Sequence, residues 1–371
     1  MRKEKAITFV VTKDCQLACK YCYQVGKNSK ERMPFPLAKR AVDIILGNQD
    51  LFPEDNVVWD FIGGEPLLEI ELIDKICDYI QSQCVMLNHK WRDKYSIRIT
   101  TNGLLYNSNK VQRFIQKYKD RITISISFDG IKEKQDLNRV FPNGRGSYDK
   151  VIVNVKKWID DFIDVGTKMV ISSKDIPYIK ESGMHLLNLG IKRLDMNFVL
   201  EDVWKKGDDK IVEEQLVEFA DAIIANKLYK DRKIYVFEES IGHPFNPDFD
   251  SVPCGSLMLS VDASGLFYTC MRFAKFSLTK KEARIVGNVY DGIDCNKLRP
   301  YYVIDELSQS PSQCRNCEVA TGCRWCPAEN YDNSCTNTMF ERFIAICKIH
   351  KAKVRAKNYY WNKLKKENYY V

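Results

Sequence analysis

The run Lys13-Asp14-Cys15-Gln16-Leu17-Ala18-Cys19-Lys20-Tyr21-Cys22-Tyr23 places three cysteines at C-x3-C-x2-C spacing, directly after a strand-like segment at residues 6–12. A 4Fe-4S cluster needs four ligands and takes them as thiolates, so three clustered cysteines leave one iron open to a small molecule. The spacing of Cys15, Cys19 and Cys22 therefore predicts an iron-sulfur site that performs chemistry and does more than store electrons.

Two other uses of cysteine fit this run less well. Disulfide frameworks are typical of small secreted chains, whereas 371 residues can bury a large core and no secretory segment precedes Cys15. Zinc is the stronger alternative, because C-x2-C pairs are common zinc ligands. Zinc sites usually combine two such pairs, and no second pair lies near residues 15–22.

The composition, with 45% hydrophobic and 29% charged residues, is typical of a globular soluble protein. No stretch approaches the roughly 18 apolar residues of a membrane span, so we expect a cytoplasmic protein that does not enter a membrane. The net charge of +8 suits an acidic partner, either a peptide or a nucleic acid, without choosing between them.

Cysteine density divides the chain, with five cysteines in the first 250 residues and nine in the remaining 121. A turn-rich stretch at residues 242–247 marks the expected break. We predict a large domain at residues 1–235, a small cysteine-rich α+β domain at 236–350 and a basic helix or tail at 351–371.

Short β-branched runs alternate with amphipathic ones through the first domain, which is the pattern of βα units. The predicted strands are residues 6–12, 56–62, 95–101, 121–128, 167–172 and 192–199. The predicted helices are residues 36–46, 69–85, 109–117, 148–162, 177–189 and 212–227. Six repeats predict an α/β fold, a partial (β/α)6 barrel similar to a TIM barrel.

The ends of the first four predicted strands carry the residues that suit a site, because active sites of βα barrels form at the C-terminal ends of the strands. The first strand leads into the cysteine loop. The next three end in Gly63-Gly64-Glu65-Pro66, Thr100-Thr101-Asn102-Gly103 and Ser127-Phe128-Asp129-Gly130. One such turn alone is most often only a tight connection, but four in succession predict a shared site.

These residue types predict roles toward a bound metabolite. Gly63 and Gly64 lack a Cβ, so backbone carbonyls can approach an ammonium group, and Glu65 can hold that group or fix the turn.

Ser127 and Arg139 can take hydroxyl and carboxylate groups, since an arginine fork pairs with carboxylates. Tyr21 can pack against an aromatic base. Asn102 and Asp129, at neighbouring strand ends, complete the predicted cofactor-binding set.

The cysteine loop, its aromatic residue before the last cysteine and the Gly-Gly-Glu-Pro turn resemble the radical S-adenosylmethionine (radical SAM) superfamily, over residues 1 to about 230. The resemblance implies that the amine and carboxylate of S-adenosyl-L-methionine bind the open iron, with Gly63, Gly64 and Glu65 near the amine. It also implies Ser127 and Arg139 near the ribose and the carboxylate.

The second domain holds eight cysteines in 94 residues: Cys254, Cys270, Cys314, Cys317, Cys323, Cys326, Cys335 and Cys347. Eight thiols suffice for two clusters, although the C-x2-C-x5-C-x2-C core alone also suits zinc. Residues 262–270 predict a β-hairpin with a glycine turn that ends in a cysteine. Cys77 and Cys84 lie seven residues apart on one predicted helix, so we expect them in the core, and Cys295 is expected to be structural as well.

The glycine-turn cysteine and the later thiols resemble the SPASM extension of radical SAM enzymes, which carries two auxiliary 4Fe-4S clusters, over about residues 250–350. By this resemblance, one cluster takes Cys254, Cys270 and Cys326, with Cys335 as the simplest fourth ligand. The other takes Cys314, Cys317, Cys323 and Cys347. The run 323–326 has two intervening residues where the common pattern has three, which leaves the division of Cys326, Cys335 and Cys347 open.

The resemblance implies a radical SAM enzyme with three 4Fe-4S clusters that modifies a ribosomally made precursor peptide, including precursors that contain cysteine. Thioether or other cross-link formation, as in maturases of C-x-x-x-repeat precursors, is favoured. Formylglycine formation by an anaerobic sulfatase maturase is the alternative, but Met271 stands where those enzymes carry an aspartate base. An electron donor such as flavodoxin or ferredoxin is implied, and nucleic acid is not favoured. A non-enzymatic electron carrier or zinc module would not need the glycine-rich strand ends.

Overall fold

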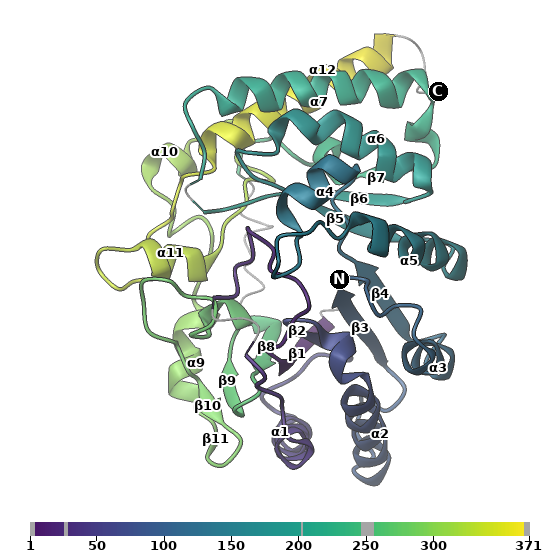
Figure 1. Cartoon of the computed structure of the whole chain (residues 1–371). Coiled ribbons are helices and arrows are strands. Elements are labelled where there is room, and N and C mark those ends of the chain that lie inside the picture. The colour runs from purple at the N-terminus through teal and green to yellow at the C-terminus, as the bar shows by residue number, and fades with distance from the viewer. Residues whose placement is uncertain (1–3, 26–28, 202, 246–255, 367–371) are drawn as a thin grey trace. The chain divides into compact units, whose positions relative to one another are not determined.

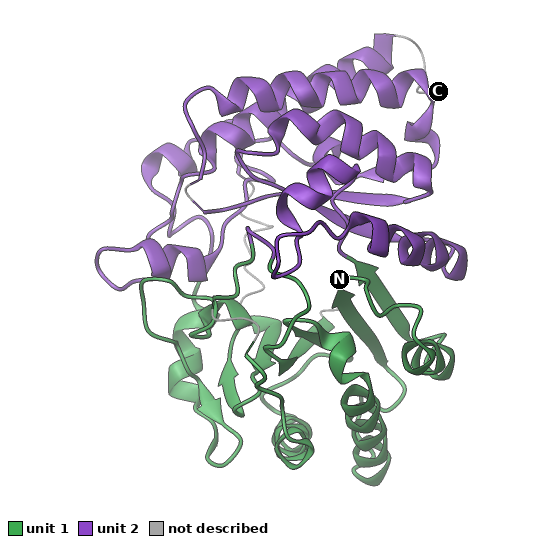
Figure 2. Cartoon of the chain, viewed as in Figure 1, with its two compact units in different colours: residues 1–18, 22–126, 251–304 green, residues 19–21, 127–250, 305–371 purple. Residues whose placement is uncertain are grey.

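The computed structural model describes residues 4–25, 29–201, 203–245 and 256–366 (Figure 1). The chain divides into two compact units, each built from segments far apart in the sequence (Figure 2). Unit 1 comprises residues 1–18, 22–126 and 251–304, and unit 2 comprises residues 19–21, 127–250 and 305–371. The domain boundaries at residues 235 and 350 remain predictions, and the turn-rich stretch at residues 242–247 lies partly outside the described residues.

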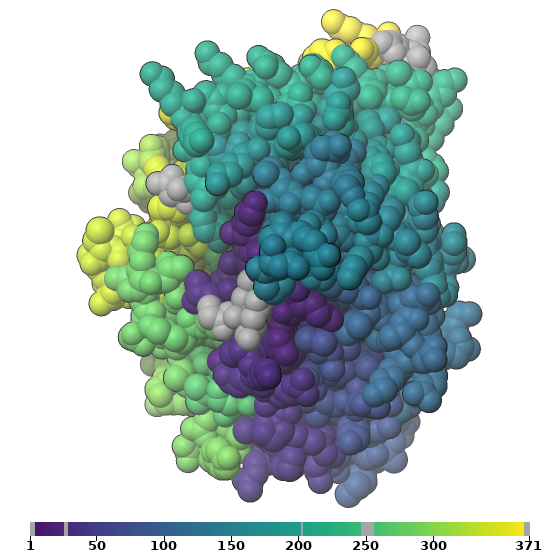
Figure 3. All heavy atoms as spheres, in the orientation of Figure 1, coloured from purple at the N-terminus to yellow at the C-terminus, as the bar shows by residue number. Residues whose placement is uncertain are grey.

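Unit 1 is centred on parallel strands: β1 (Glu4–Thr12), β2 (Asn56–Gly63), β3 (Tyr95–Thr101) and β4 (Ile122–Ile126). One face of this sheet is covered by α1 (Phe35–Gly47), α2 (Ile70–Met86) and α3 (Asn109–Lys117), as Figure 1 shows. Their outward side chains form part of the surface of unit 1 in Figure 3. Ile97 and Ile99 of β3 are buried at alternate positions, as the two-residue period of a strand requires.

The sheet continues beyond β1 with β8 (Met258–Val261), which pairs parallel to β1. Antiparallel strands follow: β9 (Leu266–Tyr268), β10 (Gly287–Asn288) and β11 (Gly292–Ile293), then helix α9 (Cys295–Tyr302). Gly265 adopts a φ of 83° in the turn between β8 and β9, which glycine favours. The predicted hairpin that leads into Cys270 is therefore present.

Unit 2 contains a second parallel sheet of β5 (Gly166–Ile171), β6 (Arg193–Phe198) and β7 (Lys233–Ile234). Its helices include α4 (Lys132–Asn138), α5 (Tyr148–Asp161), α6 (Ile179–Leu189) and α7 (Asp208–Ala225). The C-terminal part adds α10 (Ser312–Arg315), α11 (Pro327–Asn333) and α12 (Cys347–Lys366). Ion pairs of Arg355 with Glu213 at 2.6 Å and Lys363 with Asp221 at 2.8 Å join α12 to α7.

Short 3-10 turns complete the described structure: η1 (Pro66–Glu69), η2 (Ile176–Tyr178), η3 (Leu228–Lys230), η4 (Tyr235–Phe237) and η6 (Met271–Phe273). The α/β fold is confirmed, and every predicted strand and helix of the first domain is present with small shifts at its ends. The sequence did not predict α4 or β8, both of which are short. Among the described residues, no helix is long and apolar enough to cross a membrane.

Candidate functional site

The glycine turn after β2 packs directly against the start of the cysteine loop. Gly64 N–H donates to the Thr12 carbonyl at 2.9 Å, and Glu65 N–H donates to the Asp14 carbonyl at 2.8 Å. A Cβ on Gly63 would lie 2.4 Å from the Thr12 carbonyl oxygen, and one on Gly64 would lie 2.2 Å from that of Asp14. Only glycine permits this close approach, so the turn positions the chain just before Cys15.

Glu65 joins the ends of β2 and β3. Its side chain is fully buried and accepts hydrogen bonds from Thr101 Oγ1 at 2.6 Å, Asn102 N–H at 2.7 Å and Leu67 N–H at 3.0 Å. Burial raises the pKa of Glu65 to about 7, although these hydrogen bonds act in the opposite direction. Of the two roles predicted for Glu65, the contacts match that of fixing the turn.

Polar donors surround Cys15 within unit 1. Leu17 N–H lies 3.4 Å from its sulfur, and Asn102 Nδ2 lies 3.9 Å from the sulfur and 3.1 Å from Gln16 Oε1. N–H groups directed at a cluster thiolate stabilise its negative charge. Cys15 therefore sits in surroundings that suit a cluster ligand.

The Gly63 carbonyl faces a nitrogen donor, because Gln24 Nε2 donates to it at 2.8 Å and Gln24 is buried. An amino group would make the same kind of contact with this oxygen. The Gly63 carbonyl is thus an acceptor beside the predicted amine site of the cofactor, and Gln24 is a polar residue there that was not predicted from the sequence.

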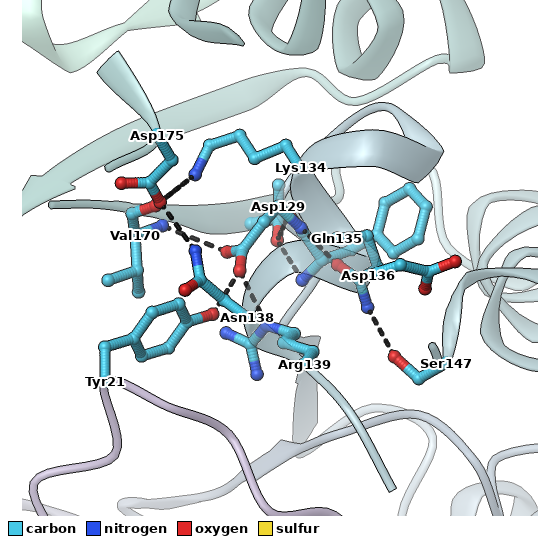
Figure 4. A network of polar contacts seen from close by, with 12 residues as sticks. Tyr21, Asp129, Lys134, Gln135, Asp136, Asn138, Arg139, Ser147, Val170 and Asp175 are labelled. Atoms are coloured by element: carbon cyan, nitrogen blue, oxygen red, sulfur yellow. Dashed lines mark hydrogen bonds and ion pairs between the residues drawn. The ribbon is translucent and has the colours of Figure 1, made fainter. Parts of the chain in front are cut away.

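A buried polar network in unit 2 joins Tyr21, Asp129 and Arg139 (Figure 4). The Tyr21 hydroxyl and Arg139 Nε both donate to Oδ2 of Asp129, the latter at 2.9 Å, while Val170 N–H donates to Oδ1 at 3.0 Å. Burial raises the pKa of Asp129, but Arg139 and Lys134 outweigh it and hold that pKa below its usual value. The structure thus brings three predicted cofactor residues together, and their roles toward the cofactor remain predictions.

A second buried ion pair supports this network. Lys134 and Asp175 are both fully buried and lie 2.8 Å apart, and Asn138 Nδ2 donates to the same carboxylate at 2.8 Å. The Asn138 carbonyl in turn accepts from Lys20 N–H at 2.9 Å, which ties the loop segment 19–21 to α4. Lys134 and Asn138 lie four residues apart on α4, a spacing that would have indicated a shared face had this short helix been predicted.

The remaining predicted residues of the first domain lie as follows. Ser127 is half-buried and comes directly after β4. Cys15, Cys19 and Cys22 are half-buried, whereas Cys77 and Cys84 are buried on α2, as expected for core residues. Cys295 is exposed at the start of α9.

Four downstream thiols line one pocket in unit 2, with a volume of about 90 Å³: Cys314, Cys317, Cys323 and Cys347. They are the set that the sequence analysis gave to one auxiliary cluster. Among the described residues, no three His, Cys, Asp or Glu side chains are placed to hold a single metal ion. The four cysteines line one volume, and their role as ligands of a multi-atom cluster remains a prediction.

Basic side chains also line this pocket: Arg324, Arg342, His350 and Lys351. Arg342 is buried and donates to Glu306 at 3.0 Å, to Ser310 at 3.0 Å and to the Cys323 carbonyl at 3.3 Å. Burial raises the pKa of Cys323 to about 11, with Arg342 acting in the opposite direction. A buried cation suits a pocket that takes up thiolates.

His350 turns one ring nitrogen away from solvent. Its Nε2 lies 2.6 Å from the Val319 carbonyl, and its buried Nδ1 has no hydrogen-bond partner among the described residues. Burial lowers the pKa of His350 to about 4. No role was predicted for this histidine from the sequence, although Cys347 and His350 are three residues apart on α12 and so lie on the same face of the helix.

The other predicted auxiliary set is only partly described. Cys270 is buried after β9 in unit 1, and Cys326 and Cys335 belong to unit 2, half-buried and exposed respectively. Cys254 lies outside the described residues. This ligand set remains a prediction.

Residues 9–173 match the Radical SAM superfamily. The chain contains a radical SAM domain. The matched segment includes the cysteine loop, the Gly-Gly-Glu-Pro turn and the Tyr21–Asp129–Arg139 network, so the predicted superfamily is confirmed.

Curated relatives of the chain include one uncharacterized protein and two whose names state different activities. An uncharacterized protein of Methanocaldococcus jannaschii is 32% identical over 53% of this chain and 63% of its own length. A cysteine-type anaerobic sulfatase-maturating enzyme of Clostridium novyi is 28% identical, over 38% of this chain and 37% of its own. A probable GTP 3',8-cyclase of Methanococcus maripaludis is 24% identical over 64% of this chain and 74% of its own length. The chain thus spans less than two thirds of the first two relatives.

Solved structures share the fold over nearly the whole chain. A polyhistidine-tagged anSMEcpe with bound AdoMet aligns with a TM-score of 0.71 at 19% identity, covering 100% of this chain and 96% of that one. SuiB of Streptococcus suis bound to precursor peptide SuiA aligns at 0.62 and 16% identity, covering 93% and 76%. At these identities the likeness shows the fold alone.

Met271 of the radical SAM chain, at the position where sulfatase maturases carry the proposed base, meets an aromatic side chain. The Tyr23 hydroxyl lies 3.3 Å from the Met271 sulfur, and the Arg272 guanidinium lies 5.0 Å from the centre of the Tyr23 ring. Neither a thioether nor a neutral phenol is a proton acceptor at neutral pH.

Proposed function

We propose that this chain is a radical SAM peptide maturase that removes a hydrogen atom from a ribosomally made precursor and installs an oxidative modification, a thioether or another cross-link. The four-thiol pocket downstream of the radical SAM domain carries the proposal. A three-thiol site leaves an iron open for S-adenosyl-L-methionine, whereas a fully ligated cluster suits electron transfer.

The chain's own residues would hold and orient the cofactor. Cys15, Cys19 and Cys22 would bind the catalytic cluster, and the Gly63 carbonyl would accept a hydrogen bond from the amino group in place of Gln24. When bound, cluster and cofactor supply the 5′-deoxyadenosyl radical that takes a hydrogen atom from the substrate.

Formation of the thioether bond leaves one electron that must be accepted. Joining a substrate thiol sulfur to the carbon that lost its hydrogen atom releases one proton and one electron. The pocket cluster would take up this electron, and the cationic side chain of Arg342 would stabilise the added negative charge. The second auxiliary cluster, with Cys254, Cys270, Cys326 and Cys335, remains part of the proposal.

A peptide substrate is supported by the fold, since anSMEcpe was solved with a Cp18Cys peptide and SuiB with precursor peptide SuiA. A low-potential donor such as flavodoxin or ferredoxin would reduce the catalytic cluster. Formylglycine formation is the second candidate, supported by the similarity to the cysteine-type anaerobic sulfatase-maturating enzyme of Clostridium novyi. The contact of Met271 with Tyr23 does not favour formylglycine formation, because it supplies no carboxylate base at that position.

The test is anaerobic reconstitution followed by dithionite and S-adenosyl-L-methionine. We expect about twelve irons per chain, three clusters of four, and formation of 5′-deoxyadenosine. Mass spectrometry should show that peptides with C-x-x-x repeats lose the mass of two hydrogen atoms for each cross-link. An aldehyde product on a sulfatase-type peptide would support the second candidate, and bound zinc with little iron would refute both.

A further inference from the structure

A row of polar side chains crosses the sheet of unit 1 on the face opposite its helices. The strand register aligns Thr8 with Ser260 and Asp60, then Asp60 with Arg98, and Arg98 with Thr123. The row therefore runs across β8, β1, β2, β3 and β4 without an apolar member.

The part of this face over β3 and β4 is open to solvent. Ile97 and Ile99 are at most 1% exposed, whereas the Arg98 side chain is 44% exposed and Thr100 and Thr123 are exposed. Parallel sheets are normally covered on both faces and are rich in Val, Ile and Leu. An exposed polar face on such a sheet is thus typical of a binding surface.

The cation at the centre of this row is held in place by buried partners. Arg98 Nε donates to Asp60 Oδ1 at 2.8 Å, and Thr8 Oγ1 donates to Asp60 Oδ2 at 3.1 Å. Asp60 is buried, so its position is fixed. Among the described residues, no acceptor bonds the two Nη nitrogens of Arg98, which remain available for a second carboxylate.

We propose that Arg98 binds a carboxylate of the substrate peptide on this exposed sheet face. The inference rests on the proposed function and narrows the substrate to a peptide with an acidic side chain or a nearby C-terminus. Arg98 of β3 lies four residues before Asn102, which directly follows the strand, a span of about 13 Å along an extended chain. The carboxylate should therefore lie within about four residues of the modified position in an extended peptide.

The probes are two Ala-based synthetic peptides that carry one Cys and differ only in having Glu or Gln about three residues away. Their affinities for the reconstituted protein are measured by fluorescence anisotropy at low salt. We expect the Glu peptide to bind at least about tenfold more tightly, because hydrogen bonds to a charged group are worth that much.

The variant Arg98→Gln combined with Asp60→Asn removes the cation without leaving a buried carboxylate unpaired, and it should lose the preference for the Glu peptide. Arg98→Lys should keep only part of this preference, because an ammonium keeps the charge but cannot form the two parallel hydrogen bonds of a guanidinium with a carboxylate. The control Arg113→Gln removes an exposed arginine from α3 and should keep it.

Equal binding of both peptides by the wild type, absence of binding included, would overturn the inference, as would a Glu preference that survives in the double variant. Cleavage of S-adenosyl-L-methionine without peptide, measured on the same wild-type sample, separates the two levels. No cleavage would refute the proposed function, whereas cleavage with equal peptide binding would refute the inference alone.

Discussion

The three-thiol loop and the four-thiol pocket differ in what surrounds their sulfurs. The loop that carries Cys15 is positioned by backbone contacts from the glycine turn and receives side-chain amides. The pocket lined by Cys314 and its partners has a full set of thiols and basic neighbours such as Arg342. Under the proposed function, this difference predicts an open site for chemistry at the loop and a closed site for electron transfer at the pocket.

The largest expected effect comes from removing thiols at each site. Alanine substitution of Cys15, Cys19 and Cys22 should abolish 5′-deoxyadenosine formation with loss of about four irons. Alanine substitution of Cys314 and Cys317 should also lose about four irons but retain cofactor cleavage. Iron analysis and chromatography of the products measure both, and equal loss of cleavage in the two variants would erase the distinction.

The buried pair beneath the loop predicts the next effect. Lys134→Ala leaves Asp175 charged and buried, which should cost about 3–5 kcal/mol of unfolding free energy. The matched Lys132→Ala removes an exposed lysine paired with Asp149 and should change stability little. Denaturant unfolding of both variants provides the measurement, and a similar loss in each would contradict the supporting role of Lys134.

Much of the loop site was predictable, because its residues are contiguous motifs at strand ends. The cysteine spacing and the Gly-Gly-Glu-Pro turn both fall where the structure has loops. Lys134 and Asp175 were not predictable, since they meet only through folding and α4 is one of the shortest helices. The sequence pattern also could not reveal that Gln24 faces Gly63, a contact across 39 positions.

For the four-thiol pocket, the cysteines were predictable but their surroundings were not. Its four thiols were grouped by resemblance, and the structure places them together. The buried environments of Arg342 and His350 depend on their contacts with Glu306 and Val319, residues 36 and 31 positions away, which no local pattern encodes.

Glu65 gives the loop site a pH signature of moderate size. Its pKa is about 7 in the fold against 4.5 as the ordinary value, so the unfolded chain loses the proton first and stability falls as pH rises from 4.5 to 7. The total loss of unfolding free energy from this shift is on the order of 3 kcal/mol, and it does not grow further above pH 7. Glu65→Gln should lack that fall, so the stability difference between variant and wild type should shift in favour of the variant. Parallel pH slopes in thermal unfolding would exclude the effect.

The smallest predicted effect sharpens the electron-accepting role of the pocket. Arg342→Gln should make the reduction potential of the pocket cluster more negative, because a buried cation stabilises the reduced form. Arg315→Gln, an exposed neighbour of Cys314, should shift it less, because solvent screens that charge. Redox titration followed by electron paramagnetic resonance measures both shifts, and equal shifts would argue against a special role for Arg342.

The difference between an open and a closed site is tested most directly by the electron paramagnetic resonance spectrum of the reduced protein with and without S-adenosyl-L-methionine. Signals are assigned with the two sets of cysteine variants. The account predicts that the cofactor changes the signal lost with Cys15, Cys19 and Cys22 and leaves the signal lost with Cys314 and Cys317 unchanged. A cofactor-induced change confined to the pocket signal would contradict it.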